Sequence, residues 1–236
     1  MNRIILVDQD FGAGTNRAVL QGRRAIHIQK VIRGRVGTVL RVGLLNGPIG
    51  KGTVVAQADA RVELEVELSD GDSTMMPCTL LLALPRPKTM KRVLQAAAAF
   101  GVERVVLMES WRVEKSFWSS PLLESKALNE QLMLGLEQGG GTRVPEVLIR
   151  RRFRPFAEDE LPTLTSGRLA LLAHPRSIAC CPARVEQPFC LALGPEGGWT
   201  PFEVDSFKGA GFVPVHLGDR ILRVDQAVPA FLGRLL

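Results

Sequence analysis

The segment Leu191–Thr200 constrains the fold more than any other, because an apolar run leads directly into Gly194-Pro195-Glu196-Gly197-Gly198. A helix start follows at once. Thr200 suits the N-cap position, Pro201 suits the first helical position, and Glu203 suits the N3 position of a capping box. Glycines let a backbone approach a ligand closely, and a helix N-terminus adds a partial positive charge. The segment therefore predicts a strand, a tight turn and a helix, as either a ligand-binding loop or an ordinary connection.

Two neighbouring segments have a similar order. Val215–Ala227 reads as a strand, a turn at Gly218 and a helix start, and Leu169–Arg176 reads as a strand that ends in a turn. Three strand ends with ligand-type loops thus fall within one short stretch of chain. Together they favour a ligand site over an isolated connecting turn.

Strands and helices alternate from residue 78 onward. Apolar runs at Cys78–Leu84 and Arg104–Met108 predict strands, and helical periodicity predicts helices over Pro87–Phe100 and Glu124–Gln138. A last helix is expected from Leu222 to the C-terminus. This alternation is typical of an α/β domain with a mostly parallel sheet covered on both faces.

The first seventy residues follow a different pattern. Strands are expected at Asn2–Val7, Thr38–Leu45 and Val62–Leu68, with a short helix over Gly22–Arg33 and a hairpin signal at Asn46-Gly47. We therefore predict a small β domain over residues 1–70, a linker over residues 71–77 and an α/β domain over residues 78–236.

Positive charge is concentrated in the β domain. Residues 1–53 carry nine Lys or Arg against two Asp, whereas the net charge of the whole chain is +6. Such a concentration suits binding of nucleic-acid phosphates, although a solvated basic face is the simpler alternative. Arg24 and Arg33 are expected to be exposed on the short helix.

The three loop segments resemble, in order, those of the SPOUT-class RNA methyltransferases of the RsmE type. The stretches His27–Arg33, Arg86–Gly101 and Arg143–Glu146 add to the resemblance. Two stretches depart from the family pattern: Val224-Asp225-Gln226 stands where Thr-Glu-Thr is usual, and Ala96–Phe100 replaces a more polar helix end. The resemblance implies a C-terminal α/β domain with a deep trefoil knot, preceded by a PUA-like β-barrel.

The resemblance also implies S-adenosylmethionine as cofactor and methylation of uridine N3 in small-subunit ribosomal RNA, free or in the assembled subunit. A cytoplasmic homodimer is expected. Residues expected at the cofactor are Leu172, His174, Leu193, Gly194, Glu196, Gly197, Gly198, Leu217, Gly218, Ile221 and Leu222. Residues expected at the RNA are Arg23, Arg24, His27, Lys30, Arg33 and Arg35.

The reaction limits the catalytic candidates. The N3 proton of uridine must leave, and the resulting negative charge on the base needs a cation or backbone N–H groups. Arg220 and Arg223 are the candidates for that role, and Glu196 or Asp225 for the proton acceptor. Helix capping is the simpler reading of both acids.

Other interpretations remain open. A binding protein that kept the fold but lost the reaction would account for the change at Val224–Gln226. A dehydrogenase could use Gly12–Arg17, which begins like a dinucleotide fingerprint. His216 reads as a core residue, and Trp111, Phe117 and Trp118 could stack on RNA bases or pack against a partner subunit.

Membrane and metal sites are not expected. The longest apolar run, Cys78–Leu84, is too short to cross a bilayer, and the N-terminus does not look like a signal peptide. Cys78, Cys180, Cys181 and Cys190 lack paired metal-ligand spacing, so we expect reduced thiols.

Overall fold

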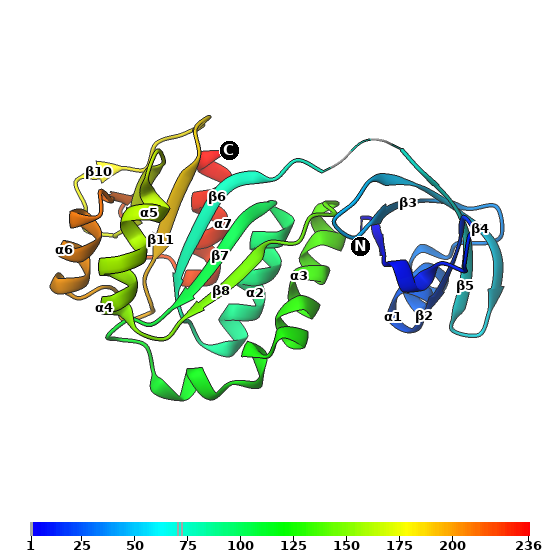
Figure 1. The fold of residues 1–236 in the computed structure, drawn as a ribbon, viewed down its shortest axis with the longest axis horizontal. Coiled ribbons are helices and arrows are strands. Elements are labelled where there is room, and N and C mark those ends of the chain that lie inside the picture. Colours follow the sequence, from blue (N-terminus) through cyan, green and yellow to red (C-terminus); the bar gives the residue numbers. More distant parts are fainter. Residues whose placement is uncertain (1, 70, 72) are drawn as a thin grey trace. The chain divides into compact units, whose positions relative to one another are not determined.

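A computed structural model describes residues 2–69, 71 and 73–236. The chain divides into two compact units (Figure 1). The first comprises Met1–Thr74 and Leu136–Val144, and the second comprises Met75–Gly135 and Pro145–Leu236. The segment Leu136–Val144, which the sequence prediction assigned to the second domain, thus groups with the first unit.

The first unit is built on one five-stranded sheet with the order β1-β3-β4-β5-β2. Its strands are β1 (Ile4–Leu6), β2 (Arg17–Gln21), β3 (Val39–Leu44), β4 (Ile49–Ala58) and β5 (Arg61–Leu68). In this sheet, β1 and β3 pair in parallel, and the other strand pairs of the described residues are antiparallel. Along β5, Val62, Leu64 and Val66 are buried in the core of this unit while the glutamates between them face outward, as their alternation predicts.

The basic helix is present but not regular. α1 (Gly22–Ile26) continues as a π-helical turn, η2 (His27–Ile32), and ends where Arg33 takes a left-handed φ of 57°. Ala25 and Ile28 are buried, whereas Ile32 is 39% exposed. A π-turn closes i→i+5 hydrogen bonds, so its wider winding rotates Ile32 away from the face that Ile28 occupies.

The second unit is built on a seven-stranded sheet with the order β10-β12-β9-β11-β6-β7-β8, and every pairing in it is parallel. Its strands are β6 (Met76–Ala83), β7 (Val102–Met108), β8 (Glu146–Arg150), β9 (Leu169–Ala173), β10 (Ala179–Cys180), β11 (Phe189–Leu193) and β12 (Val213–His216). β6 begins inside the predicted linker, since Met76 already pairs with Val102.

Helices cover both faces of this sheet. Its helices are α2 (Pro87–Ala99), α3 (Ser125–Gly139), α4 (Phe153–Pro155), α5 (Leu161–Thr165), α6 (Pro201–Gly209) and α7 (Val224–Leu235), and the end of α3 from Leu136 onward groups with the first unit. α2 and α7 pack against each other behind the strands in Figure 1, and α4, α5 and α6 lie on the other face. Short 3-10 helices are present at η1 (Asp8–Asp10) in the first unit and at η3 (Lys115–Ser119) and η4 (Pro121–Leu123) in the second. A π-helical turn, η5 (Phe156–Glu160), lies between α4 and α5.

Two predicted boundaries differ from the structure for local reasons. The last helix begins at Val224 rather than Leu222, because Arg223 is extended (φ −69°, ψ 155°) and acts as the N-cap. The fingerprint-like Gly12–Arg17 leads into strand β2, whereas a dinucleotide loop requires a helix at that point. The dehydrogenase interpretation is therefore wrong.

Candidate functional site

The predicted loops share one edge of the sheet. β9, β11, β6 and β12 run in parallel, so the loops that follow them, together with the loop after β7, leave the sheet at its carboxyl edge. This edge is the usual ligand-binding side of an open α/β sheet. The sequence placed ligand-type loops after β9, β11 and β12, and parallel pairing brings these loops to the same side.

The loop after β11 is closed by its own hydrogen bonds. Gly198 has a φ of 71° and donates from its N–H to the carbonyl of Pro195 at 2.8 Å. The predicted capping box is confirmed: the Glu203 carboxylate accepts from the N–H of Thr200 at 2.7 Å, and the Thr200 hydroxyl accepts from the N–H of Glu203 at 3.3 Å. These bonds fix the glycine turn to the start of α6.

The loop after β7 is attached to the same turn. The N–H of Trp111 donates to the second Glu203 oxygen at 2.8 Å, and the Arg112 guanidinium donates to the carbonyl of Gly197 at 2.6 Å. A Cβ on Gly197 would lie 3.2 Å from the Arg112 side chain, and one on Gly194 would lie 3.0 Å from the Trp199 ring. The glycines are thus required by packing within the protein itself. Sequence reasoning missed Arg112, because no local pattern connects it to Gly197.

The loop after β12 leaves apolar and basic side chains exposed. Gly218 has a φ of 123°, which favours glycine, and donates its N–H to Nδ1 of His216 at 2.9 Å. Ile221 is 82% exposed and Leu222 39% exposed, and the side chains of Arg220 and Arg223 reach solvent. His216 therefore lies half-buried at the strand end, where it shapes the loop, rather than in the core as predicted.

Asp225 is held by two arginines. Its carboxylate, at the first turn of α7, accepts a 2.7 Å hydrogen bond from Arg92 on α2 and lies 3.6 Å from the guanidinium of Arg223. The hydrogen bond from Arg92 lowers the pKa of Asp225 below its usual value. A carboxylate with a lowered pKa is a poorer base, so this geometry disfavours Asp225 as the proton acceptor.

The departures from the family pattern at the start of α7 have structural roles. Val224 is buried, Asp225 pairs with Arg92, and the Gln226 side chain accepts from the N–H of Arg223 at 3.3 Å. These residues therefore still cap and anchor the helix.

The remaining predicted cofactor residues differ in exposure. Leu172 and Leu193 are buried inside their strands, so their backbones rather than their side chains are available at the edge. Leu217 is half-buried, and His174 is half-buried with its Nδ1 accepting from the N–H of Arg176 at 3.2 Å. Glu196 is exposed, and its carboxylate accepts from the N–H of Arg86 at 3.4 Å.

Two buried polar atoms near this edge have no hydrogen-bond partner within the described residues. They are Nε1 of Trp199, in the glycine turn, and Oγ of Ser110, just after β7. Unpartnered buried donors are rare in folded proteins. Together with the exposed Ile221 and Leu222, they fit a ligand that has both polar groups and an apolar face.

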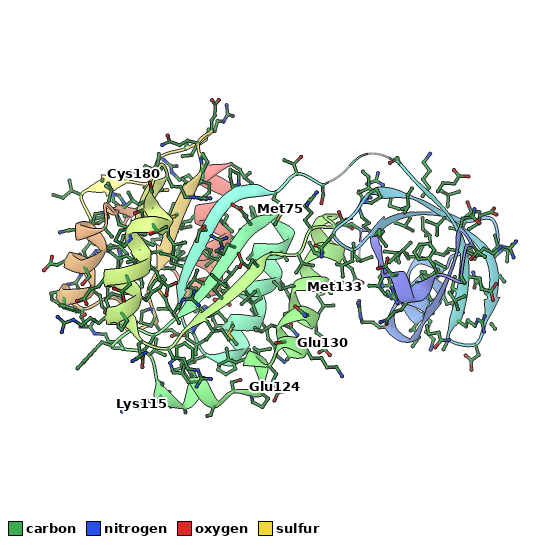
Figure 2. All side chains as sticks on the ribbon, viewed as in Figure 1. Met75, Lys115, Glu124, Glu130, Met133 and Cys180 are labelled. Carbon is green, nitrogen blue, oxygen red and sulfur yellow. The ribbon has the colours of Figure 1, made fainter. Side chains whose placement is uncertain are left out.

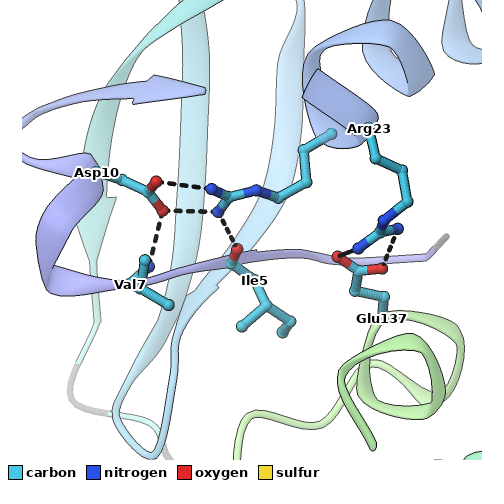
Figure 3. A network of polar contacts seen from close by, with 6 residues as sticks. Ile5, Val7, Asp10, Arg23 and Glu137 are labelled. Carbon is cyan, nitrogen blue, oxygen red and sulfur yellow. Dashed lines mark hydrogen bonds and ion pairs between the residues drawn. The ribbon is translucent and has the colours of Figure 1, made fainter. Parts of the chain in front are cut away.

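The predicted RNA-binding cations separate into two groups, and Figure 3 shows part of the paired group, with Arg23 bonded to Glu137. Arg24 is only 20% exposed and makes two hydrogen bonds to the nearly buried Asp10, so the prediction of an exposed Arg24 is wrong. Arg23 makes two hydrogen bonds to Glu137, which is also buried. By contrast, Lys30, Arg33 and Arg35 are exposed, and no ion pair joins them to any described residue.

His27 adds little charge to this surface. It is half-buried, and burial lowers the pKa of its imidazole, which favours the neutral form near pH 7.

The thiols are free among the described residues. Burial raises the pKa of Cys78 well above its usual value and raises the pKa of both Cys181 and Cys190 to about 11. Cys180, on the short strand β10, is the exposed one (Figure 2). Within the described part of the chain, no group of His, Cys, Asp or Glu side chains could hold a metal ion, and no helix has the length and apolar character needed to span a membrane.

The family model of the RNA methyltransferase domain matches residues 72–236. The chain belongs to this family. It is 26% identical over 235 residues to the Ribosomal RNA small subunit methyltransferase E of Treponema pallidum, an alignment that covers 98% of this chain and 88% of the relative. The protein of the same name from Synechocystis is 24% identical and is covered over 69% of its length.

Solved structures agree with the fold. The Ribosomal RNA small subunit methyltransferase E of Neisseria gonorrhoeae, bound to S-adenosyl methionine, superposes with a TM-score of 0.74. It is 24% identical, and the match covers 98% of this chain and 95% of that one. The α/β architecture with a parallel-sheet domain is therefore the one expected for this family.

Proposed function

We propose that this protein uses S-adenosylmethionine to methylate N3 of a uridine in small-subunit ribosomal RNA. The observation that carries the proposal is the attachment of two loops to each other at the carboxyl edge, through Glu203 and Arg112, in a chain of the RNA methyltransferase family. Proteins of similar sequence carry the name of a small-subunit rRNA methyltransferase, which supports the substrate class.

The cofactor would lie against the glycine turn and the loop after β12. The backbones of Leu172, Leu193, Gly194, Gly197, Gly198 and Gly218 would hold its polar groups, with His174 and Glu196 beside them. The exposed Ile221 and Leu222, with Leu217, would cover its adenine ring. When bound, this cofactor supplies a methyl group on a sulfonium.

The catalytic roles fall to the exposed side chains near these loops. Arg220 and Arg223 would stabilise the negative charge that develops on the uracil ring as its proton leaves. Glu196, which is exposed and, among the described residues, accepts from the backbone N–H of Arg86, would accept that proton. Asp225 would instead hold Arg223 in place, since its own carboxylate is engaged by Arg92.

The exposed cations of the first unit, Lys30, Arg33 and Arg35, would contact RNA phosphates, and the paired Arg23 and Arg24 would support that surface. We further propose that the first unit is a PUA-like barrel, that the C-terminal strands form a trefoil knot, and that the protein acts as a cytoplasmic homodimer. The implied family fold is the support for these finer statements.

The direct test is a methyl-transfer assay with small-subunit rRNA and with assembled small subunits, followed by mass mapping of the product. Methylation at uridine N3 is expected. Transfer to a ribose hydroxyl or to a guanine would refute the specificity. Binding of S-adenosylhomocysteine without any transfer to either substrate would favour the non-catalytic alternative.

A further inference from the structure

The loop after β7 presents a tryptophan to solvent from a fixed backbone. Trp111 is 86% exposed, although tryptophan is on average a highly buried residue. Its N–H donates to the carboxylate of Glu203, which is 1% exposed. The same carboxylate also binds Thr200, so the position of Trp111 is set by a buried, multiply bonded group.

A second anchor joins this loop to the end of β8. The N–H of Glu109 donates to the carbonyl of Arg150 at 2.9 Å, and the guanidinium of Arg151 lies 5.5 Å from the centre of the Trp118 ring. That separation is typical of a cation–π contact. Lys115, in the same segment, is exposed (Figure 2). Aromatic rings and cations are thus interleaved along two adjacent segments.

The arginines at the end of β8 and just after it are not equivalent. Arg150 pairs with Glu160, and Arg154 pairs with Glu158. Arg151 and Arg152 are exposed, and no carboxylate of a described residue pairs with either. Two cations that pair with no carboxylate of a described residue therefore follow β8, and one of them, Arg151, lies over the half-buried ring of Trp118.

We infer that Trp111, Trp118, Arg151 and Arg152 form a platform that binds single-stranded RNA next to the methylated nucleotide. Bases would stack on the indole rings, and the two guanidiniums would contact the phosphates. This inference deepens the proposed function and rests on it for the identity of the RNA. A protein partner fits less well, because it would bury two unpaired guanidiniums at a high desolvation cost.

The test is binding of a fluorescein-labelled single-stranded RNA of about 12 nucleotides, followed by anisotropy over a range of salt concentrations. Trp111→Ala should weaken binding about 5- to 150-fold, and Trp111→Phe, which keeps an aromatic face, should restore most of it. Arg151→Ala should lower the salt slope by about 0.7. The matched control is Arg154→Ala, which removes an exposed arginine that is already paired.

A second measurement reads Trp111 directly and leaves its ring in place. In a Trp118→Phe, Trp199→Phe variant, Trp111 is the remaining indole, and its fluorescence should be quenched as the RNA binds. Absence of quenching together with native affinity of Trp111→Ala would overturn the inference. The inference would also be overturned if Trp111→Ala bound RNA normally but sedimented as a smaller species, because Trp111 would then contact a second copy of the chain.

The proposed uridine methylation and the proposed RNA platform can be refuted independently of each other. If the RNA quenches Trp111 but no uridine is methylated, the proposed reaction fails and the platform stands. If uridine N3 is methylated and Trp111→Ala binds and methylates like the parent protein, the platform fails alone.

Discussion

The guanidinium of Arg92 and the carboxylate of Asp225 form a 2.7 Å hydrogen-bonded ion pair between residues 133 positions apart in the chain. The pair links α2 to the first turn of α7. The negative charge of Asp225 also stabilises α7 there, because a helix N-terminus carries a partial positive charge. Arg223, the N-cap of α7, lies 3.6 Å from the other oxygen of Asp225. Asp225 thereby restricts an arginine that we propose acts on the substrate.

We expect Asp225→Asn to lower the free energy of unfolding by about 0.5–1 kcal/mol at neutral pH, because Arg92 is half-exposed and its pairing is screened by water. Arg92→Ala should lower the free energy of unfolding by a similar amount. The double variant should be only slightly less stable than either single variant. Urea denaturation of the four proteins measures the coupling, with Lys91→Ala as an exposed control on the same helix. Strictly additive losses would contradict a direct interaction.

The same pair predicts a pH dependence. The pKa of Asp225 is lowered in the folded protein, so the stability it contributes is fully present above its unfolded pKa of about 4. That contribution is lost as the pH falls through the lowered folded-state pKa. The difference between the parent protein and Asp225→Asn should therefore be constant from about pH 8 to pH 5 and shrink only below about pH 4. A difference that changes between pH 5 and 8 would point to another group.

Gly197→Val should weaken binding of S-adenosylhomocysteine about tenfold, measured by calorimetry, because overpacking costs about 1–3 kcal/mol and about 1.4 kcal/mol is a tenfold change in affinity. A Cβ at this position would lie 3.2 Å from the Cβ of Arg112, so the valine would press on that side chain and displace the loop after β7. Gly209→Val, at the open end of α6, is the control and should bind normally. Unchanged affinity of Gly197→Val would show that the turn does not contact the ligand.

Arg24→Ala should destabilise the protein by about 2–3 kcal/mol, because it leaves the Asp10 carboxylate almost buried with its guanidinium partner removed. Arg61→Ala, which breaks the exposed pair with Glu63, should cost less than about 1 kcal/mol. Thermal or urea unfolding distinguishes the two. Equal losses would mean that the Asp10 pair is no more important than a surface contact.

A double change of Arg33 and Arg35 to Ala should weaken rRNA binding and reduce its salt slope by about 0.7–0.9 for each lost charge. Both side chains are exposed, so stability and cofactor affinity should stay near those of the parent protein. Arg61→Ala is again the control, because its charge is already paired. An unaltered salt slope would remove these arginines from the RNA contact.

Thiol labelling offers an independent check on the packing of the second unit. Cys180 is exposed, whereas Cys181 and Cys190 are buried and have a pKa of about 11. Only the thiolate reacts, so iodoacetamide near pH 8 should label Cys180 alone until the protein is unfolded. Peptide mass mapping would report this, and rapid labelling of Cys190 in the folded protein would contradict the packing of β11.

Local signals predicted local structure well. Thr200, Pro201 and Glu203 predicted the start of α6, and the helical periodicity over Pro87–Phe100 predicted α2. β8 was missed, because its residues are half-exposed at the edge of the sheet and lack the apolar run of a central strand. Strand β2 was missed for a similar reason, since only Ala18 and Leu20 face the core.

Long-range partners could not be predicted. Arg24 reads as one more cation on a basic helix until the fold places Asp10 beside it. Asp225 reads as a proton acceptor or a helix-capping residue until α2 brings Arg92 into contact with it. In both cases the spacing of the residues along the chain carries no information about the pair, and the charge of each side chain is used by the protein itself.

The composition of the first unit has a consequence for how the chain is made. This unit includes Leu136–Val144, and its Arg23 is bonded to Glu137. An N-terminal fragment that stops at residue 74 would lack that segment and expose the positions it covers. During synthesis, the N-terminal unit therefore remains incomplete until residue 144 has left the ribosome. By then β6 and β7 of the other unit have already been made, so their apolar residues are exposed while the N-terminal unit is still unfinished.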